Sequence, residues 1–458
     1  MTRPNVVVFL TDQQRWDSLG AAGNPLGLTP NLDAMCRTGT MFEVACTTNP
    51  VCAPARAALQ TGRYPTNAGV HRNGRPLPPD VPTLAREFGA AGYQTGYIGK
   101  WHLSSEEPVP KQDRGGYDSW LAANLLEFSS DAYHTVVYDE DDEAVFLPGY
   151  RSDALVDAAI RFIARASRRD QPFLLFLSLL EPHHQNEQDN YPAPDVYRDT
   201  YTSAWLPPDL AALPGTAHQH AGGYYGQIKR VDEGFGRLRD ALTSLRLSDS
   251  TLVLYTSDHG SHFKTRNDEY KRSPHDGSIR VPLVVDGPGY RGGRRVQAPV
   301  STVDVVPTLL AAAGIACEEH LDGRPLDRYF DIPADAADGV LVQVSETEVG
   351  RALRTSRWKY HVHAPDAGDV PCADTYTERA LYDLDADPYE LDNLIDSENH
   401  VDVAAELRGQ LVDAVRRVED MEVAVRPWQG VTRRLRHPDP RARGGAFPAR
   451  VLERDAGV

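Results

Sequence analysis

The sequence predicts an α/β protein in which helices sandwich a large, mostly parallel sheet, with a smaller C-terminal α+β subdomain that carries a short antiparallel sheet. Two observations lead to this prediction. Apolar, β-branched runs alternate along the chain with segments of helical pattern, as they do in sheets covered on both faces. After residue 335 the pattern changes to closely spaced short strands followed by one long helix.

The first strand is expected at Asn5–Thr11, which is apolar and is followed at once by polar residues. Similar runs predict buried strands at residues 93–98, 173–180, 251–256 and 281–285. Helices are expected to start at the Thr29 cap, to run from Cys52 to Gly62, and to cover residues 83–91, 152–166, 224–245 and 303–313. Ligands of such sheets bind beyond the carboxyl ends of the strands.

The C-terminal part has its own organisation. Residues 331–339 form a linker of Ala, Asp and Pro, and short strands are expected at 340–344, 352–355, 358–362 and 380–383, before a helix at 401–421. The predicted division is therefore a catalytic domain at 1–335, a subdomain at 336–424 and a tail at 425–458. The Arg-, Pro- and Gly-rich tail is either disordered or wraps the body or a neighbouring subunit of a homo-oligomer.

The composition and net charge of the chain limit the classes of partner and substrate that it can bind. The 458-residue chain is 41% hydrophobic and 25% charged, ordinary values for a globular protein, and it lacks a run of the ~18–20 apolar residues that a membrane span needs. Its net charge of −17 disfavours nucleic acid and anionic membranes as partners, but not a small anionic substrate. Five cysteines give no disulfide framework, and the first strand leaves no room for a signal peptide, so a cytoplasmic location is expected.

Two polar pairs, Asp12-Gln13 and Asp258-His259, each follow a predicted strand. The carboxyl ends of parallel strands meet at one edge of a sheet, so these side chains are expected to converge on one cation. Two carboxylates, an amide oxygen and an imidazole favour Ca²⁺ or Mg²⁺, and the imidazole also admits Mn²⁺. The competing interpretation is that each aspartate caps the helix that follows it.

Cys52 opens a predicted helix in the pattern Cys-x-Pro-x-Arg, followed by Leu-x-Thr-Gly-Arg. A helix N-terminus beside Arg56 suits an anion. The pattern resembles the signature of the type I, formylglycine-dependent sulfatases of the alkaline phosphatase superfamily. The resemblance implies that a formylglycine-generating enzyme oxidises Cys52 to an aldehyde, whose hydrate attacks sulfur, that position 52 also contacts the metal, and that Arg56 supports this nucleophile electrostatically.

Further blocks strengthen the resemblance. Gly99-Lys100-Trp101-His102 is similar to a sulfatase block in which the lysine neutralises a sulfate oxygen and the histidine accepts a proton. Pro182-His183-His184 is similar to a block whose histidine faces the leaving-group oxygen. By position this is His183, although His184 is adjacent and could substitute. Histidine suits the role because its pKa lies near neutrality.

The segment from Asp258 to Pro282 also matches the family, and its spacing places the active-site lysine at Lys271, with Lys264 as the competing candidate. Within this segment, Arg266, Asn267 and His275 differ from the residues more common in the family, and they are candidates for substrate contacts. His184 is a further candidate. A solvated loop is the alternative interpretation of the first two. The C-terminal segments 358–360 and 381–394 resemble the sulfatase C-terminal subdomain.

The sequence therefore predicts a metal-dependent sulfatase acting on a sulfated carbohydrate or another small alcohol sulfate. Many sulfatases carry two adjacent aspartates where this chain has Asp12-Gln13. This departure keeps open an alternative, a phosphonate monoester or phosphodiester hydrolase on the same scaffold. A non-catalytic relative would have lost some of the motif residues, and all of them are present.

Overall fold

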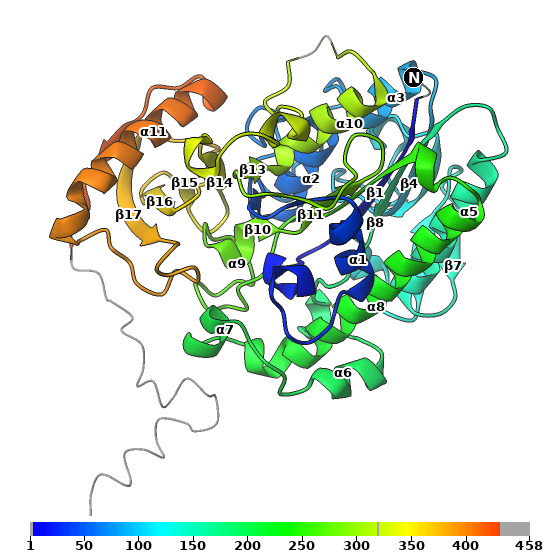
Figure 1. Ribbon diagram of the computed structural model, residues 1–458, viewed down its shortest axis with the longest axis horizontal. Coiled ribbons are helices and arrows are strands. Elements are labelled where there is room, and N and C mark those ends of the chain that lie inside the picture. Colours follow the sequence, from blue (N-terminus) through cyan, green and yellow to red (C-terminus); the bar gives the residue numbers. More distant parts are fainter. Residues whose placement is uncertain (1–2, 318–319, 431–458) are drawn as a thin grey trace, which may run out of the picture.

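The computed structural model describes residues 3–317 and 320–430. The largest sheet contains β1 (Asn5–Thr11), β2 (Thr40–Phe42), β4 (Gln94–Lys100), β5 (Ser119–Ala123), β6 (Thr135–Tyr138), β7 (Ala144–Leu147), β8 (Phe173–Ser178), β9 (Thr251–Ser257), β11 (Leu283–Asp286) and β12 (Arg294–Val296). Their order is β12-β2-β11-β9-β1-β8-β4-β5-β6-β7 (Figure 1). The strands from β9 to β5 are parallel, whereas β11 on one side and β6 and β7 on the other pair antiparallel.

Helices cover both faces of this sheet. They are α2 (Cys52–Thr61), α3 (Leu84–Ala90) and α10 (Val305–Ala313) on one face and α1 (Pro30–Thr38), α5 (Arg151–Ala166) and α8 (Ala217–Ser244) on the other. The same part of the chain contains four short helices, α4 (Leu126–Ser129), α6 (Asp195–Tyr201), α7 (Pro208–Ala212) and α9 (Asp276–Ile279). Alternate residues of β1 face opposite sides. Val6, Val8 and Leu10 pack with α2, α3 and α10, and Val7 and Phe9 pack with α1, α5 and α8. The predicted α/β class is confirmed, and the sheet is mixed at its edges.

A smaller sheet follows in the chain. Its strands are β14 (Val340–Val344), β15 (Val349–Arg354), β16 (Trp358–Ala364), β17 (Thr375–Asp383) and β18 (Ala424–Arg426), backed by α11 (Val401–Glu419). Its first four strands are antiparallel, as predicted, and β18 pairs parallel to β17. The predicted tail therefore begins inside this sheet, and residues 431–458 lie outside the described residues. Short strands β3 (Ala45–Cys46), β10 (Arg280–Val281) and β13 (Val300–Ser301) form a third sheet.

The structure corrects one strand prediction. The strand expected at 281–285 is divided at Pro282 into β10 and β11, which belong to different sheets. Proline has no N–H to donate to a ladder, so the chain changes sheets there. Within the described ranges, no helix combines the length and the hydropathy of a membrane span.

Gly99, at the end of β4, is required by its surroundings. Its φ is +107°, and a Cβ there would overlap the carbonyl oxygen of Ser178 on the neighbouring strand β8. Only glycine combines a left-handed φ with so close a backbone approach. This contact sets the position of the next residue, Lys100, whose carbonyl accepts a hydrogen bond from the Ser178 hydroxyl at 2.8 Å.

We predict that Gly99→Ala lowers the free energy of unfolding by about 3 kcal/mol or more, because the strain of the left-handed φ is added to a backbone clash. Gly292→Ala is the matched control, with φ +116° and nothing within 4 Å of its added Cβ. This control should lose only about 1 kcal/mol. Denaturant unfolding measures both, and equal losses would show that the approach to Ser178 is not tight.

Candidate active site

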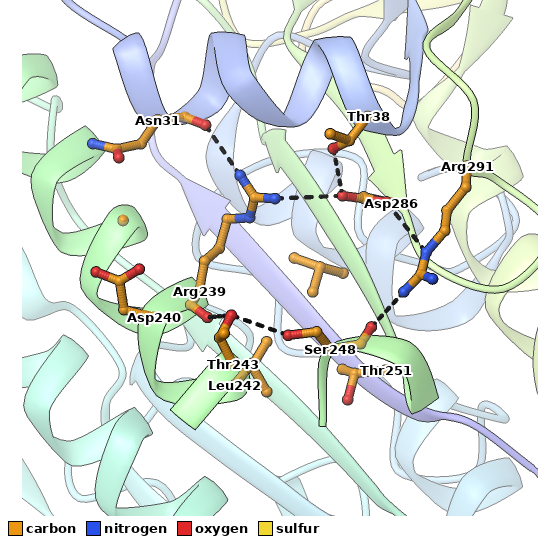
Figure 2. Close-up of a pocket in the computed structure, with 12 residues that line it drawn as sticks. Asn31, Thr38, Arg239, Asp240, Leu242, Thr243, Ser248, Thr251, Asp286 and Arg291 are labelled. Carbon is orange, nitrogen blue, oxygen red and sulfur yellow. Dashed lines mark hydrogen bonds and ion pairs between the residues drawn. The ribbon is translucent and has the colours of Figure 1, made fainter. Parts of the chain in front are cut away.

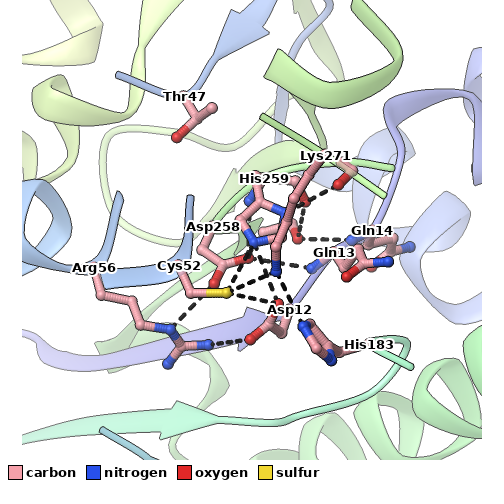
Figure 3. A network of polar contacts seen from close by, with 12 residues as sticks. Asp12, Gln13, Gln14, Thr47, Cys52, Arg56, His183, Asp258, His259 and Lys271 are labelled. Atoms are coloured by element: carbon pink, nitrogen blue, oxygen red, sulfur yellow. Dashed lines mark hydrogen bonds and ion pairs between the residues drawn. The ribbon is translucent and has the colours of Figure 1, made fainter. Parts of the chain in front are cut away.

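Cys52 is the first residue of α2 and is 1% exposed. Pro54 lies in the first turn of this helix, where a proline is tolerated, and Gly62 ends it with φ 66°. The Cys52 Sγ lies 2.9 Å from Lys271 Nζ, 3.1 Å from His259 Nε2 and 3.8 Å from Asp12 Oδ1 (Figure 3). It also lies 4.0 Å from Lys100 Nζ. Position 52 is thus the centre of a buried polar cluster.

The environment of Cys52 sets it apart from the other buried cysteines. Burial alone would raise the pKa of its thiol, but the charges of Lys100, Lys271 and His259 hold that pKa well below its usual value. Burial raises the pKa of Cys36 to about 12 and that of Cys46 to about 11. A low thiol pKa in an electropositive site is typical of a cysteine with a chemical role.

Four donors are arranged to hold a cation. Adjacent strands β1 and β9 end in register, which brings Asp12 beside Asp258 and His259. One donor atom from each of these three residues and the Cys52 sulfur lie within 4.8 Å of one another. Burial and the nearby Asp12 raise the pKa of Asp258 to about 6. Two facing buried carboxylates and an imidazole fit Ca²⁺, Mn²⁺ or Mg²⁺, and a cation here would relieve the repulsion between them.

Gln13 lies beside this group but makes other contacts. Its backbone N–H donates to Asp258 Oδ1 at 3.1 Å, and its side-chain nitrogen donates to the hydroxyls of Tyr191 and Ser261. Its Oε1 is buried without a hydrogen-bond partner among the described residues. That Gln13 binds the metal stays a prediction.

Arg56 braces the two carboxylates. Its Nη2 donates to Asp12 Oδ2 at 2.9 Å and its Nε to Asp258 Oδ2 at 3.1 Å, while Nη1 donates to the Lys100 carbonyl and to Ser178 Oγ. These bonds occupy the Oδ2 atoms and leave the Oδ1 atoms facing Cys52 and His259. The side chain predicted to support the nucleophile therefore acts through the candidate metal ligands.

Lys100 is the last residue of β4 and His102 lies two residues beyond it, so both lie at this strand end, as predicted. Lys100 is fully buried, and its Nζ donates to Asp12 Oδ2 and to Glu127 Oε1, each at 2.8 Å. His102 has a left-handed φ of 62° and its Nδ1 lies 4.0 Å from Glu127 Oε1. Sequence reasoning missed Glu127, which sits in the four-residue helix α4. The available signal was its place just after β5, the neighbour of β4 in the sheet.

The structure places Lys271, rather than Lys264, at the sulfur of Cys52. Lys271 Nζ is also 3.0 Å from His183 Nε2, whereas Lys264 pairs with Asp189 and lies over the ring of Tyr270. His183 Nδ1 is 2.6 Å from the carbonyl of His184, so Nδ1–H is its donor and Nε2 accepts from Lys271. Burial and Lys271 lower the pKa of His183, which favours the neutral form of its imidazole.

The predicted substrate contacts lie at varying distances from this group. The ring of His184 stacks on His183 with centroids 4.4 Å apart. Arg266 donates to the carbonyls of Tyr389 and Glu390, and His275 contacts the Tyr382 hydroxyl, so both tie the large sheet to the smaller one. Asn267 bonds within its own loop. Substrate contacts by these residues stay predictions.

A separate cavity of about 500 Å³ lies at the opposite ends of the strands, between α1, α8 and the start of β9 (Figure 2). Its two guanidinium groups already face carboxylates. Arg239 lies 3.5 Å from Asp286, and Arg291 lies 2.8 Å from Asp249. It therefore offers an anion less free positive charge than the Cys52 cluster does.

Comparison with known proteins assigns the family. The sulfatase family model matches residues 4–315, and the model described as N-sulphoglucosamine sulphohydrolase, C-terminal, matches residues 268–417. An ulvan-active sulfatase of Formosa agariphila is 33% identical over 413 residues, which cover 86% of this chain and 77% of that protein. The choline-sulfatase of Rhizobium meliloti is 29% identical, over 86% of this chain and 83% of the relative.

Solved structures agree in fold. The yidJ structure of Bacteroides fragilis has a TM-score of 0.79 at 25% identity and covers 91% of this chain and 96% of its own. A phosphonate monoester hydrolase of Agrobacterium radiobacter has a TM-score of 0.69 at 24% identity, over 90% and 95% of the two chains. Fold and site thus define a member of the alkaline phosphatase superfamily. Within that superfamily the chain belongs to the sulfatase family, whose members are sulfuric ester hydrolases.

We predict that, in protein with an unconverted Cys52 and in metal-free buffer, the Cys52 thiol ionises at lower pH than the thiols of Cys36 and Cys46. Lys100, Lys271 and His259 lower the pKa of Cys52, while burial raises the pKa values of the other two. Lys271→Met should move the thiolate absorbance to higher pH because it removes the cation at 2.9 Å. Lys264→Met is the control and should change nothing. Ultraviolet titration that gives the same curve for both variants would contradict the predicted role of Lys271.

Proposed function

We propose that this chain hydrolyses sulfate esters at position 52, after a formylglycine-generating enzyme has converted Cys52 and with a divalent cation, preferably Ca²⁺, on Asp12, Asp258 and His259. The observation that carries the proposal is the convergence on Cys52 of metal donors together with the ammonium groups of Lys100 and Lys271. When present, the cation and the formylglycine supply Lewis-acid polarisation of the sulfate oxygens and a hydroxyl nucleophile.

The chain's own residues supply the charge and the protons. A sulfate ester is anionic, and buried Lys100 and Lys271 place positive charge on two sides of position 52 in a site from which water is largely excluded. Lys271 Nζ donates to His183 Nε2 at 3.0 Å, so it is placed to donate to the departing alcohol oxygen directly or through His183 Nε2. His102 is the expected acceptor of a proton from the hydroxyl at position 52.

A polar cavity that is linked to the start of α2 through Asn73 supports a hydroxyl-rich alcohol as the other half of the substrate. The cavity of about 760 Å³ lies between residues 72–73, the β14–β15 turn and the β16–β17 connection. Asn73 joins it to the nucleophile helix, because its Oδ1 accepts from the N–H of Ala53 and its own N–H donates to Glu346. Glu346 also pairs with Arg272, the residue after Lys271.

The side chains in this cavity suit a sugar. Its walls carry two guanidinium groups, three carboxylates, an imidazole and an amide, and they contain no large aromatic ring: Arg72, Arg379, Glu346, Glu348, Asp369, His363 and Asn73. Such groups bind hydroxyls through many directed hydrogen bonds. Ulvan activity in a relative that is 33% identical agrees with a carbohydrate sulfate as substrate.

We predict that Arg72→Ala and Arg379→Ala each lower kcat/KM for a monosaccharide sulfate about tenfold, because each loses a charged hydrogen bond to the sugar. Hydrolysis of an aryl sulfate, which has no such hydroxyls, should change less than about threefold. Arg416→Ala is the control, since Arg416 is also half-exposed and paired with carboxylates but lies on α11. Equal losses on both substrates would remove this cavity from the proposal.

A second candidate function, hydrolysis of phosphonate monoesters or phosphodiesters, is favoured by one observation. Gln13 replaces the second aspartate of many sulfatases, so the candidate metal site has one negative charge fewer. The phosphonate monoester hydrolase of Agrobacterium radiobacter shares the fold.

We predict that the purified protein turns over an aryl sulfate faster than the matching aryl phosphonate monoester, with Ca²⁺ present and with position 52 shown by peptide mass to be an aldehyde. Steady-state kinetics on the two substrates decide between the functions. A large preference for the phosphonate would replace the leading proposal with the second candidate.

A further inference from the structure

Glu127 is a buried carboxylate at the centre of the site that no sequence motif predicted. It is 2% exposed, and its Oε1 accepts from Lys100 Nζ at 2.8 Å. Burial alone would raise its pKa, but Lys100 and His102 bring it down to about 2, so it is ionised. A buried carboxylate costs several kcal/mol unless it is paired, so a charge kept at this position calls for an explanation.

The first part of the explanation lies in the partners of Lys100. Asp12 Oδ2 accepts one hydrogen bond from Arg56 Nη2 at 2.9 Å and a second from Lys100 Nζ at 2.8 Å, so it already contacts two cationic groups. Glu127 Oε1 accepts from the same ammonium at the same distance. The two carboxylates hold the ammonium between them, 4.0 Å from Cys52 Sγ, rather than on Asp12 alone.

The second part concerns His102. Its Nδ1 and the Glu127 Oε2 are both buried without hydrogen-bond partners among the described residues, and Nδ1 lies 4.0 Å from the other oxygen of the same carboxylate. The backbone N–H of His102 donates to the carbonyl of Asn124, which lies in the short connection to α4. The imidazole and the carboxylate are therefore anchored to the same end of β5.

The backbone of Glu127 is itself fixed. The side-chain amide of Gln185 donates to the carbonyls of Glu127 and Ser130, at 2.6 and 3.0 Å. Arg151, fully buried and paired with Glu181 at 2.9 Å, donates to the Ser130 carbonyl and to Gln185 Oε1. This network holds a four-residue helix that could not be stable alone. The position of the carboxylate is thus built into the fold.

We propose that Glu127 is a positioning residue of the proposed sulfatase reaction, which shares the ammonium of Lys100 with Asp12 and favours a proton on Nδ1 of His102. A carboxylate charge 4.0 Å from Nδ1 attracts a proton to that nitrogen electrostatically and leaves Nε2 as the basic nitrogen. His102 is then ready to take a proton without first changing tautomer. The proposal rests on the proposed function for its effect on turnover, but not for the state of His102.

The test compares Glu127→Leu with the wild type in the Ca²⁺-loaded protein. Nitrogen-15 spectra of histidine-labelled protein report the tautomer, and the His102 signal is assigned as the one lost in His102→Gln. The spectra should show the Nδ1–H tautomer of His102 in the wild type and less of it in Glu127→Leu. For an aryl sulfate, kcat should fall about 100-fold with a much smaller change in KM, because proton transfer is affected more than binding. Glu127→Gln, which keeps an acceptor but no charge, should lie between the two.

Glu378→Gln is the control for loss of a buried, paired carboxylate, since Glu378 pairs with Arg408 in the smaller sheet. It should change neither the His102 signal nor kcat. An unchanged tautomer or an unchanged kcat in both Glu127 variants overturns the proposal. If Glu127→Leu does not fold, Glu127→Gln gives the same two measurements. If the wild type hydrolyses no sulfate ester, the proposed function fails, and the spectra alone still decide whether Glu127 sets the tautomer.

Discussion

The guanidinium of Arg56 is the group on which the rest of the site depends. It reaches the ends of four neighbouring strands through Asp258 after β9, Asp12 after β1, Ser178 of β8 and Lys100 of β4. Two buried carboxylates this close would repel each other without it. The same carboxylates hold the pKa of Arg56 above its usual value, so this counter-charge is permanent. One side chain therefore holds in place the candidate cation ligands, the backbone at Lys100 and the ends of the four strands.

This arrangement explains the spacing Cys-x-x-x-Arg. Residues four apart lie on one face of a helix, so the first turns of α2 present position 52 and Arg56 to the same strand ends. The helix is buried over its whole length. A rotation of α2 would therefore move position 52 and Arg56 together, which couples the geometry of the site to the packing of the core.

Sequence reasoning was strongest where chemistry and periodicity agree. The apolar runs identified β1, β8 and β9, and spacing distinguished Lys271 from Lys264. It was weaker where contacts are formed only by folding. Glu127 sits in a helix too short to show periodicity, and Arg266 meets carbonyls more than 120 residues away. The antiparallel edges β6 and β7 and the parallel strand β18 follow short segments whose pairing no local pattern specifies.

The complete burial of α2 has a consequence for how the protein is made. Under the proposed maturation, the enzyme that oxidises Cys52 would have to reach it before the helix is enclosed, and the enclosing groups include Lys271, 219 residues later in the chain. At ~5–20 residues per second, the ribosome needs roughly 10–45 s to supply that interval. The proposed oxidation would therefore have to precede completion of the fold, and the length of sequence between Cys52 and the residues that cover it sets the time available for it.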